Sequence, residues 1–231
     1  MRAVAETFRR LGFTDSLYYF ASLVLARGSR GQARIVRYHL VAQPVPPGVP
    51  PRPGRVIVTE VKPGDPIIAS FPRRPAVIER RFAGGAICLA AQEEGRFAGY
   101  LWLRLGPYDE DEVRCRYVTA PPERTAWDFD VYVEPAYRMG RTFARLWAAA
   151  HALLRDRGVE WTMSRISAFN AESLRSHARL GLTRLRTVTF LRAGSVQVLL
   201  SPASPWLHLS AGSASIPTLY LEAPASGRDA R

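Results

Sequence analysis

The sequence predicts a mixed α/β fold, in which one mixed β-sheet carries helices on both sides. Strand-like and helix-like segments follow one another in the order β-α-β-β-β-β-α-β-α-β-β. This order is neither strictly alternating nor segregated, and it therefore favours a mixed sheet over a parallel one. A hydrophobic content of 47% and an aromatic content of 10% are typical of a folded globular chain.

Residues 1–42 are expected to form a basic helical extension. A helix-like segment starts at a candidate cap, Asp15 or Ser16, and stops at Gly28 and Gly31. Apolar residues cover nearly its whole circumference, which favours packing against the protein. Because arginines cluster after the stop, the alternative is a helix in peripheral contact with an anionic membrane. The proline-rich residues 43–54 predict an extended linker.

Residues 55–201 form the predicted main domain. Helices are expected at 73–85, after the loop that follows residue 133, and at 170–181, where Asn170 is the N-cap and Gly181 the C-cap. Strands are expected at 55–61, 86–92, 97–105, 111–120, 127–133 and 160–169, followed by a final pair around Gly194. Residues 202–231 are rich in Ser, Ala and Pro, and they predict a loosely held tail.

The charge balance favours an anionic partner. The net charge is +12, and Lys62 is the only lysine, so nearly all positive groups are guanidinium forks that suit phosphate or carboxylate. The alternative is that the arginines are solvated surface residues. Because no nucleic-acid motif is present, no specific nucleic-acid partner is expected. The acidic run at 108–114 is expected to be a solvated loop.

The remaining composition limits the kind of site and the location. Cys88 and Cys115 are too few for a disulfide framework, and the four histidines have no metal-ligand spacing, so no metal site is expected. The longest apolar run near the start, residues 17–26, is too short to span a bilayer, which needs ~20 residues. Without a recognisable secretory signal, a cytoplasmic location is expected.

Two segments resemble the GNAT superfamily of N-acetyltransferases. "VYVEPAYRMGRTFARLW" is similar to the strand, phosphate loop and helix of that family, and "NAESLRSHARLGL" is similar to its later helix motif. The resemblance covers roughly residues 55–200 and implies a mostly antiparallel sheet. It also implies acetyl-CoA or another acyl-CoA as co-substrate, whose thioester is attacked directly by an amine of a small-molecule amine or sugar acceptor.

The resemblance implies a set of cofactor-binding residues in the first segment. The backbone of Val131 and Val133 would contact the pantetheine arm, and the phosphate loop would contain Arg138, Gly140, Arg141 and Thr142. When the family motif is aligned with this sequence, Arg141 occupies the position of the first loop glycine, and Phe143 occupies the position of the second small residue. The Phe143 ring could block the pyrophosphate or point into the core. Its spacing to Leu146 and Trp147 favours the core.

The catalytic candidates come from both segments. Asp128 and Asp130 are two apart on a strand, so we expect them to face the same side. They could take a proton from the amine, bind a cationic substrate, or pair with arginines such as Arg165. Asn170 matches the family motif. His177 occupies the position of the family tyrosine, where it could protonate the leaving thiolate or could simply pack on a helix face.

These expectations define three function hypotheses. The first is an acyl-CoA-dependent N-acyltransferase. The alternative is a non-catalytic GNAT-like binding or scaffold protein with a degenerate CoA loop, because the loop lacks its usual glycines. Nucleic-acid binding through the basic surface ranks last.

Overall fold

The contacts within the chain form two compact units. The structure is a computed structural model that describes residues 2–48, 54–212 and 215–225. The first unit consists of Met1–Pro44, Pro107–Ala120 and Met163–Arg231, and the second consists of Val45–Gly106 and Pro121–Thr162. Each unit contains strands that are mostly antiparallel and helices that flank them, which confirms the predicted fold class.

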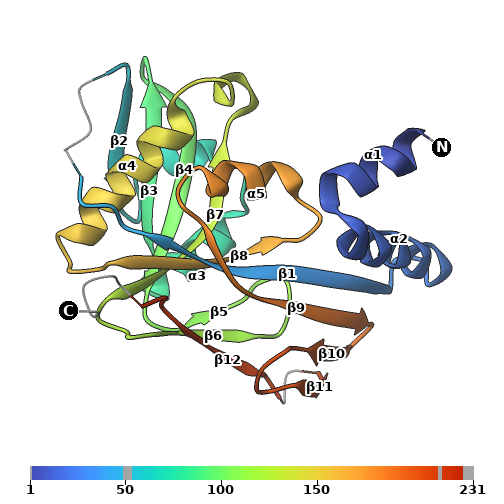
Figure 1. The fold of residues 1–231 in the computed structure, drawn as a ribbon. Coiled ribbons are helices and arrows are strands. Elements are labelled where there is room, and N and C mark those ends of the chain that lie inside the picture. The colour runs from blue at the N-terminus through green and yellow to red at the C-terminus, as the bar shows by residue number, and fades with distance from the viewer. Residues whose placement is uncertain (1, 49–53, 213–214, 226–231) are drawn as a thin grey trace. The chain divides into compact units, whose positions relative to one another are not determined.

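The second unit is built on four antiparallel strands in the order β7-β4-β3-β2. Helix α4 lies across this sheet (Figure 1). Trp102, Trp127 and Trp147 are among its largest fully buried side chains. The strands are β2 (Val56–Val61), β3 (Ile87–Glu93), β4 (Arg96–Leu105) and β7 (Thr125–Val133), and the helices are η1 (Pro66–Ser70), α3 (Pro75–Ala83), η2 (Pro135–Tyr137) and α4 (Thr142–Arg155).

The first unit contains strands in the order β11-β10-β9-β1-β8 and a small sheet in the order β12-β6-β5. Strand β12 pairs with β6 in parallel, whereas β9 pairs antiparallel with β1 and with β10. Tyr38, Phe190 and Tyr117 are buried in this unit. The elements are β1 (Ala33–Pro44), β5 (Tyr108–Asp109), β6 (Arg116–Ala120), β8 (Trp161–Ser167, in this unit from Met163), α5 (Ala171–Ala178), β9 (Thr183–Ala193), β10 (Val196–Leu200), β11 (Leu207–Ala211) and β12 (Thr218–Glu222).

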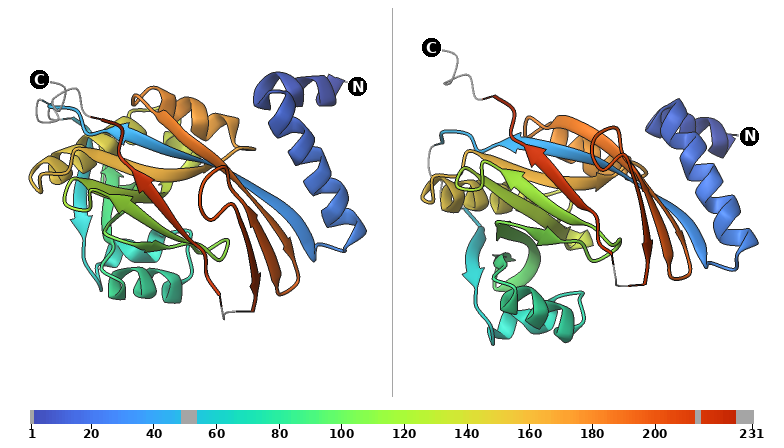
Figure 2. Two further views of the ribbon diagram at one scale, coloured as in Figure 1. Left: turned by 60° about the horizontal axis from the view of Figure 1, so that its bottom comes forward. Right: turned by 90° about the horizontal axis from the view of Figure 1, so that it is seen from below.

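Two N-terminal helices, α1 (Arg2–Leu11) and α2 (Phe13–Gly28), precede β1, and α2 packs along that strand (Figure 2). Asp15 on α2 accepts hydrogen bonds from Arg37 at 2.8 Å and contacts His39 at 3.1 Å, while Ser22 bonds the backbone of Ile35. Packing of α2 on the protein is thus confirmed. Contact of these helices with a membrane stays a prediction. In the described part of the chain, no helix combines the length and apolarity that a membrane crossing needs.

The helical extension predicted for residues 1–42 is wrong beyond Gly28, because residues 33–44 form β1. Arg30 and Gly31 adopt positive φ angles of 53° and 83°, which turn the chain out of α2 and into the strand. Residues 38–43 are buried on both faces of β1, so their sequence, which is apolar except for His39 and Gln43, does not alternate as a half-exposed strand would. Such a segment cannot be distinguished from a buried helix by periodicity alone.

The predicted loosely held tail is also wrong for residues 207–211 and 218–222. These form β11 on β10 and β12 on β6, and Leu219 and Leu221 of β12 are buried. Of the predicted proline-rich linker, residues 49–53 lie outside the described part of the chain. Val45, at its start, donates its backbone N–H to Glu160 at 2.7 Å.

We expect Asn170→Ala to cost about 1 kcal/mol of unfolding free energy. Asn170 is the N-cap of α5, as predicted, and its side-chain oxygen accepts the Ser173 N–H at 3.0 Å. Asn170→Asp retains this acceptor and should stay within a few tenths of a kcal/mol of the unmodified chain. Urea unfolding of both variants tests this, and equal losses in the two would contradict the capping role.

Candidate functional site

The predicted phosphate-loop segment lies entirely in the second unit. Strand β7 ends at Val133, one turn of 3-10 helix (η2) follows, and α4 begins at Thr142. Seven predicted site residues precede Thr142 on this strand and loop, so the chain itself brings them together: Asp128, Asp130, Val131, Val133, Arg138, Gly140 and Arg141.

Strand β7 contains a β-bulge at Asp130 and Val131. The register pairs Trp102 with Phe129 and Tyr100 with Tyr132, so two residues of β7 lie opposite the single residue between Tyr100 and Trp102. Asp130 has a φ of 48°, which places it in the left-handed region. Such bulges bend a strand and leave backbone groups outside the regular ladder.

Gly99 on β4 permits this geometry. A Cβ added at this position would lie 2.4 Å from the carbonyl oxygen of Tyr132 and 3.1 Å from the Cα of Val133. Only glycine therefore lets the two strands approach closely beside the bulge. An isolated glycine within a strand pattern is the sequence signal that could have predicted it.

Because of the bulge, the prediction that Asp128 and Asp130 face the same side is wrong. Asp130 accepts a hydrogen bond from the Tyr100 hydroxyl at 3.1 Å, so it shares the face of Tyr100, Trp102 and Phe129. Asp128 precedes Phe129 in regular strand and points to the opposite face, where it is 2% exposed. The two carboxylates therefore do not act as a pair.

Asp130 is held by two arginines that the sequence did not associate with it. Arg73 donates to both of its oxygens, with Nε at 2.8 Å from Oδ2, and Arg81 donates from Nη1 at 2.5 Å. The Asp130 and Arg81 side chains are only 12% and 10% exposed, whereas that of Arg73 is 39% exposed. Burial alone would raise the pKa of the Asp130 carboxyl, but the hydrogen bonds and charges of Arg73 and Arg81 outweigh it and lower that pKa.

Aromatic side chains surround this cluster. The Arg81 guanidinium lies over the rings of Trp102 and Phe129, 5.2 and 5.1 Å from their centroids. The Tyr100 ring contacts those of Phe71 and Tyr132 at centroid distances of 4.8 and 5.6 Å. Burial and the Asp130 charge raise the pKa of Tyr100, so its phenol stays protonated and acts as a donor.

The loop between β7 and α4 carries exposed basic side chains. Arg138 Nε donates to the carbonyl oxygen of Val133 at 3.2 Å, so this arginine lies back against the end of β7. Gly140 donates its N–H to the Tyr137 carbonyl at 3.0 Å, and a Cβ added to it would lie 3.2 Å from that oxygen. Arg141 is exposed and is the N-cap residue of α4.

The first turn of α4 combines features of an anion site. Helix geometry leaves its first N–H groups without intrahelical partners. Thr142 is 0% exposed, and its hydroxyl has no hydrogen-bond partner among the described residues. A buried hydroxyl without a partner is costly, and the unpaired N–H groups of a first helical turn suit an anion.

Phe143 packs as its helical spacing predicted. Its side chain is half-buried, and its ring centroid lies 6.3 Å from that of Trp147, one turn along α4. Since Trp147 is fully buried, Phe143 belongs to the apolar stripe of the helix. This contact favours the core orientation over a ring that fills the phosphate space.

Asn170 and His177 lie on α5, in the first unit. His177 is buried, and its Nδ1 is 2.8 Å from the Ser173 carbonyl oxygen, which only a protonated Nδ1 can approach as a donor. Burial lowers the pKa of His177, so the ring is neutral near pH 7 and its Nε2 carries no proton. The role of His177 beside a bound thioester stays a prediction.

Arg165 pairs with the acidic run instead of with the strand aspartates. It donates to both carboxylate oxygens of Glu110 at 2.8 and 2.7 Å, and the Glu110 side chain is fully buried. Glu112 in turn accepts from the Tyr38 hydroxyl. The prediction that residues 108–114 form a solvated loop is thus wrong for Glu110, whose buried carboxylate is held by Arg165, whereas the Glu112 side chain is 39% exposed.

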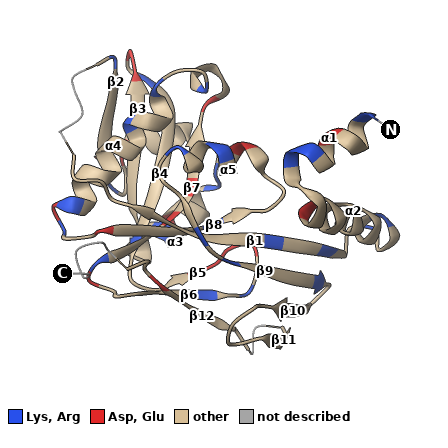
Figure 3. Ribbon diagram, in the orientation of Figure 1, with Lys and Arg blue, Asp and Glu red and all other residues tan. Residues whose placement is uncertain are grey.

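Arginines are spread over helices and strands of the chain (Figure 3). Several of them hold buried carboxylates, as Arg73, Arg81 and Arg165 do. Part of the high net charge therefore has a structural role that composition alone does not reveal. Among residues 2–48, 54–212 and 215–225, no three His, Cys, Asp or Glu side chains form a cluster that could hold a metal ion.

Comparison with known proteins finds likeness in structure only. No protein-family model matches the chain, and no curated protein matches it by sequence. Among solved structures, a tandem GNAT protein from the clavulanic acid biosynthesis pathway is 16% identical, with a TM-score of 0.50 over 77% of this chain and 58% of that one.

Two further matches have lower TM-scores. The GCN5-related glucosamine N-acetyltransferase region of a fungal multi-domain β-N-acetylglucosaminidase is 18% identical, with a TM-score of 0.48 over 71% of this chain. A GNAT-family putative acetyltransferase from Novosphingobium aromaticivorans is 19% identical, with a TM-score of 0.44 over 71% of this chain. The chain spans 22% of the fungal protein's length, 58% of the tandem protein's and 67% of the Novosphingobium protein's.

Proposed function

We propose that this chain, which has the fold of the GNAT acetyltransferases, is an acyl-CoA-dependent N-acyltransferase. The observation that carries the proposal is the N-terminus of α4, where the buried Thr142 hydroxyl has no partner among the described residues and Arg141 is exposed beside it. A helix N-terminus with an adjacent guanidinium suits a phosphate group. We propose that the pyrophosphate of acetyl-CoA or another acyl-CoA binds there.

The residues around this position fit such a ligand. The backbone N–H groups of the first α4 turn and the Thr142 hydroxyl would donate to phosphate oxygens, and Arg138 and Arg141 would neutralise their charge. At the bulge, backbone groups of Val131 would be available to the amide groups of the pantetheine arm, with Val133 one step further along β7. When bound, acyl-CoA supplies a thioester carbonyl that an acceptor amine can attack.

We propose different roles for the two strand aspartates. Asp130 is a positioning residue: its carboxylate is bound by Arg73 and Arg81 and its pKa is lowered, so it is a poor acceptor for the proton of an amine. It holds the bulge that presents Val131. Asp128, on the opposite face, stays the candidate for proton removal. We propose that Asn170 acts as the α5 cap and that His177 packs as a neutral ring.

The alternative of a non-catalytic GNAT-like scaffold is weakened by Phe143. A Phe143 ring in the phosphate space would support that hypothesis, whereas the ring contacts Trp147 on the apolar stripe of α4, which counts against it. The glycine that the loop lacks at Arg141 is a smaller obstacle, because an arginine still presents its backbone N–H and adds a phosphate donor. We also propose a small-molecule amine or sugar as acceptor and a cytoplasmic location.

We expect acyl-CoA binding to raise the free energy of unfolding by about 2.7 kcal/mol at a concentration one hundred times Kd. Thermal and urea unfolding with acetyl-CoA and with longer acyl-CoAs measure this. Arg141→Glu places a negative charge beside the phosphates and should weaken binding about tenfold. The matched control is Arg157→Glu, which changes an exposed arginine beyond the other end of α4. This variant should bind acyl-CoA as tightly as the unmodified chain.

The outcome that would overturn the proposal is the absence of any stabilisation by millimolar acetyl-CoA and by every longer acyl-CoA. Equal weakening by Arg141→Glu and Arg157→Glu would show instead that binding depends on net charge and not on the α4 N-terminus. Release of free CoA thiol in the presence of amines then tests transfer itself.

A further inference from the structure

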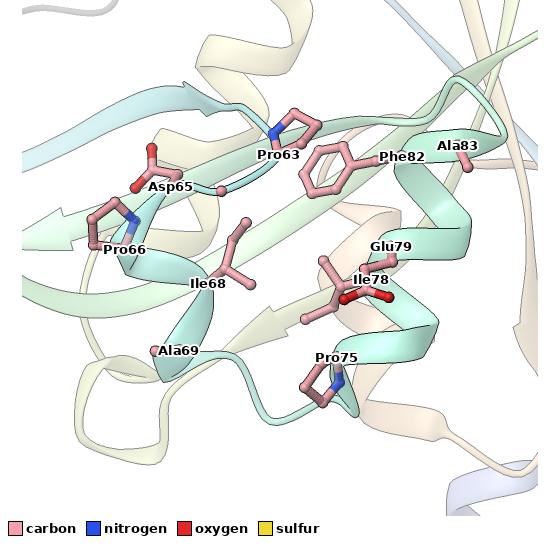
Figure 4. A pocket seen from close by; sticks show the side chains of 11 residues that line it. Pro63, Asp65, Pro66, Ile68, Ala69, Pro75, Ile78, Glu79, Phe82 and Ala83 are labelled. Atoms are coloured by element: carbon pink, nitrogen blue, oxygen red, sulfur yellow. The ribbon is translucent and has the colours of Figure 1, made fainter.

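A cavity of about 610 Å³ lies between η1 and α3 in the second unit (Figure 4). This volume is within the range typical of small-molecule sites. Its walls are mainly apolar: Pro63 and Ile68 come from the β2–η1 side, and Ile78 and Phe82 come from α3. None of the residues discussed above as cofactor or catalytic candidates lines it.

Both charged residues of the cavity wall are acidic. They are Asp65 and Glu79, and no arginine or lysine lines the cavity in the described part of a chain whose net charge is +12. One oxygen of Asp65 caps η1 by accepting the Ile67 N–H at 3.1 Å. Glu79 lies on the α3 wall beside Ile78 (Figure 4). The cavity is therefore a local acidic site in a basic protein, and it is complementary to a cation.

The walls of the cavity are preformed. Pro66 and Pro75 begin η1 and α3, where their fixed φ angles suit the first helical turn. Ile78 is 2% exposed, and the Phe82 ring contacts the buried Trp102 ring at a centroid distance of 5.0 Å. Binding would therefore require little closure of the site and little ordering of these wall residues, so the free-energy cost of both would be small.

The composition of the walls decides the ligand class. Proline, isoleucine and phenylalanine side chains offer no hydrogen bonds to a polyhydroxylated ligand, so a sugar with several hydroxyl groups would be desolvated without compensation. An apolar body with one positive charge would bury its carbon surface on these walls and keep its charge beside a carboxylate.

The same helix connects the cavity to the proposed reaction site. Arg81 of α3 donates to Asp130 at 2.5 Å, one residue before Val131 on β7. Ile78 and Phe82 of the cavity wall flank Arg81 in sequence, and all of these residues belong to the second unit. Helix α3 therefore contributes both to the cavity wall, through Ile78 and Phe82, and to the Asp130 cluster, through Arg81.

We propose that this cavity binds an organic monoamine with an apolar body, held by Glu79 and Asp65. Its identification as the acyl acceptor rests on the proposed function, whereas its binding does not. The site would favour an arylalkylamine over a sugar amine, because the walls apart from Glu79 and Asp65 are apolar and would leave sugar hydroxyl groups without hydrogen bonds.

Titration of 4-phenylbutylamine into the full chain without acyl-CoA tests the binding, followed by calorimetry or by NMR shifts. The amine should bind at least ten times more tightly than 4-phenylbutanol, its uncharged counterpart.

Glu79→Gln should weaken amine binding about five- to tenfold and leave the affinity for the alcohol unchanged. Ala69→Trp, at an exposed wall position, should fill the cavity and abolish binding of both. Glu123→Gln, an exposed control outside the cavity, should have no effect.

The outcomes separate this proposal from the function proposed above. Equal affinity for amine and alcohol, or unchanged affinity in Ala69→Trp, overturns the cation site. If the amine binds as expected but acetyl-CoA neither binds nor acylates it, the result supports the amine site and contradicts the proposed acyltransferase activity. If acetyl-CoA binds and amines are acylated at rates that Glu79→Gln and Ala69→Trp do not change, the acyltransferase stands and the cavity is not its acceptor site.

Discussion

Asp130→Ala is expected to lower the free energy of unfolding by about 3–5 kcal/mol, a loss typical when one partner of a buried ion pair is removed. The variant leaves the Arg81 guanidinium, 10% exposed and lying over Trp102 and Phe129, without its carboxylate. It also removes the acceptor of the Tyr100 hydroxyl. Urea unfolding at pH 7 measures the loss.

Arg73→Gln is the matched control within the same cluster. Arg73 bonds the same carboxylate but is 39% exposed, so solvent compensates for much of its charge, and the expected loss is about 0–1 kcal/mol. If the two variants lose the same stability, the cluster does not stabilise the protein through burial of Arg81. A normal stability of Asp130→Ala would show that Asp130 has no positioning role in the bulge.

The pH dependence of this loss has a defined sign. Because the pKa of Asp130 is lower in the folded than in the unfolded chain, its contribution is fully present above the unfolded value, about 3.9. It disappears as pH falls through the folded value. The stabilities of the unmodified chain and Asp130→Ala should therefore differ most at neutral pH, begin to approach each other below about pH 4, and come closest below the folded pKa.

Sequence patterns predicted most of the elements between residues 55 and 200, because each has a clear local signal. The helix predicted at 170–181 shows why: Asn170 supplies the N-cap as predicted, whereas the C-cap is Arg179 and the predicted C-cap, Gly181, follows it with a positive φ of 80°. The hairpin of β3 and β4 was likewise predicted from its two apolar strands and the Gly95 turn, which has a φ of 76°.

The missed strands depend on partners distant in sequence. β1 pairs with β9, about 150 residues away, and β12 pairs with β6, about 100 residues away. Their own sequences were ambiguous: β1 follows a helix and mixes apolar with basic residues without a regular alternation, and β12 is a short segment among Ser, Ala and Pro. Pairing with these distant strands determines that both segments form strands, and local sequence propensity does not predict it.

The elements that carry the candidate site were predicted, but their geometry was not. The motif correctly located the strand, loop and helix that contain Val131, Arg138 and Thr142. The bulge was missed because its sequence signal, Gly99, lies on the neighbouring strand β4 and not on β7. One extra residue in β7 then reverses which face each later side chain occupies. The partners of Asp130 were missed because Arg73 and Arg81 precede it by 57 and 49 residues.

His151 is expected to make stability fall steeply between pH 6.5 and pH 4. It is a buried residue of α4 whose ring lies 5.4 Å from that of Trp147, and its Nε2 has no hydrogen-bond partner among the described residues. Burial, aided by the nearby Arg155 charge, lowers its pKa to about 4. The ring is therefore neutral in the folded chain over a range in which the unfolded chain binds a proton.

The sign follows from this difference in protonation. The unfolded chain binds more protons below its own pKa of about 6.5, so acid favours unfolding. The contribution of His151 is complete above pH 6.5 and is lost progressively down to about pH 4. The total loss corresponds to about 3 kcal/mol of unfolding free energy.

His151→Met should remove this loss, because methionine has a similar volume and does not titrate. The measurement is the unfolding free energy of both proteins by urea at pH values from 4 to 8. His39 and His177, whose pKa values burial also lowers, are present in both proteins, so their contributions cancel in the difference curve.

At pH 8 the variant should be as stable as the unmodified chain or more stable, since it buries no unpaired ring nitrogen. The difference should then shift by about 3 kcal/mol in favour of the variant as pH falls to 4. Parallel curves would contradict this prediction, because they would mean that His151 gains a proton in the folded chain without cost.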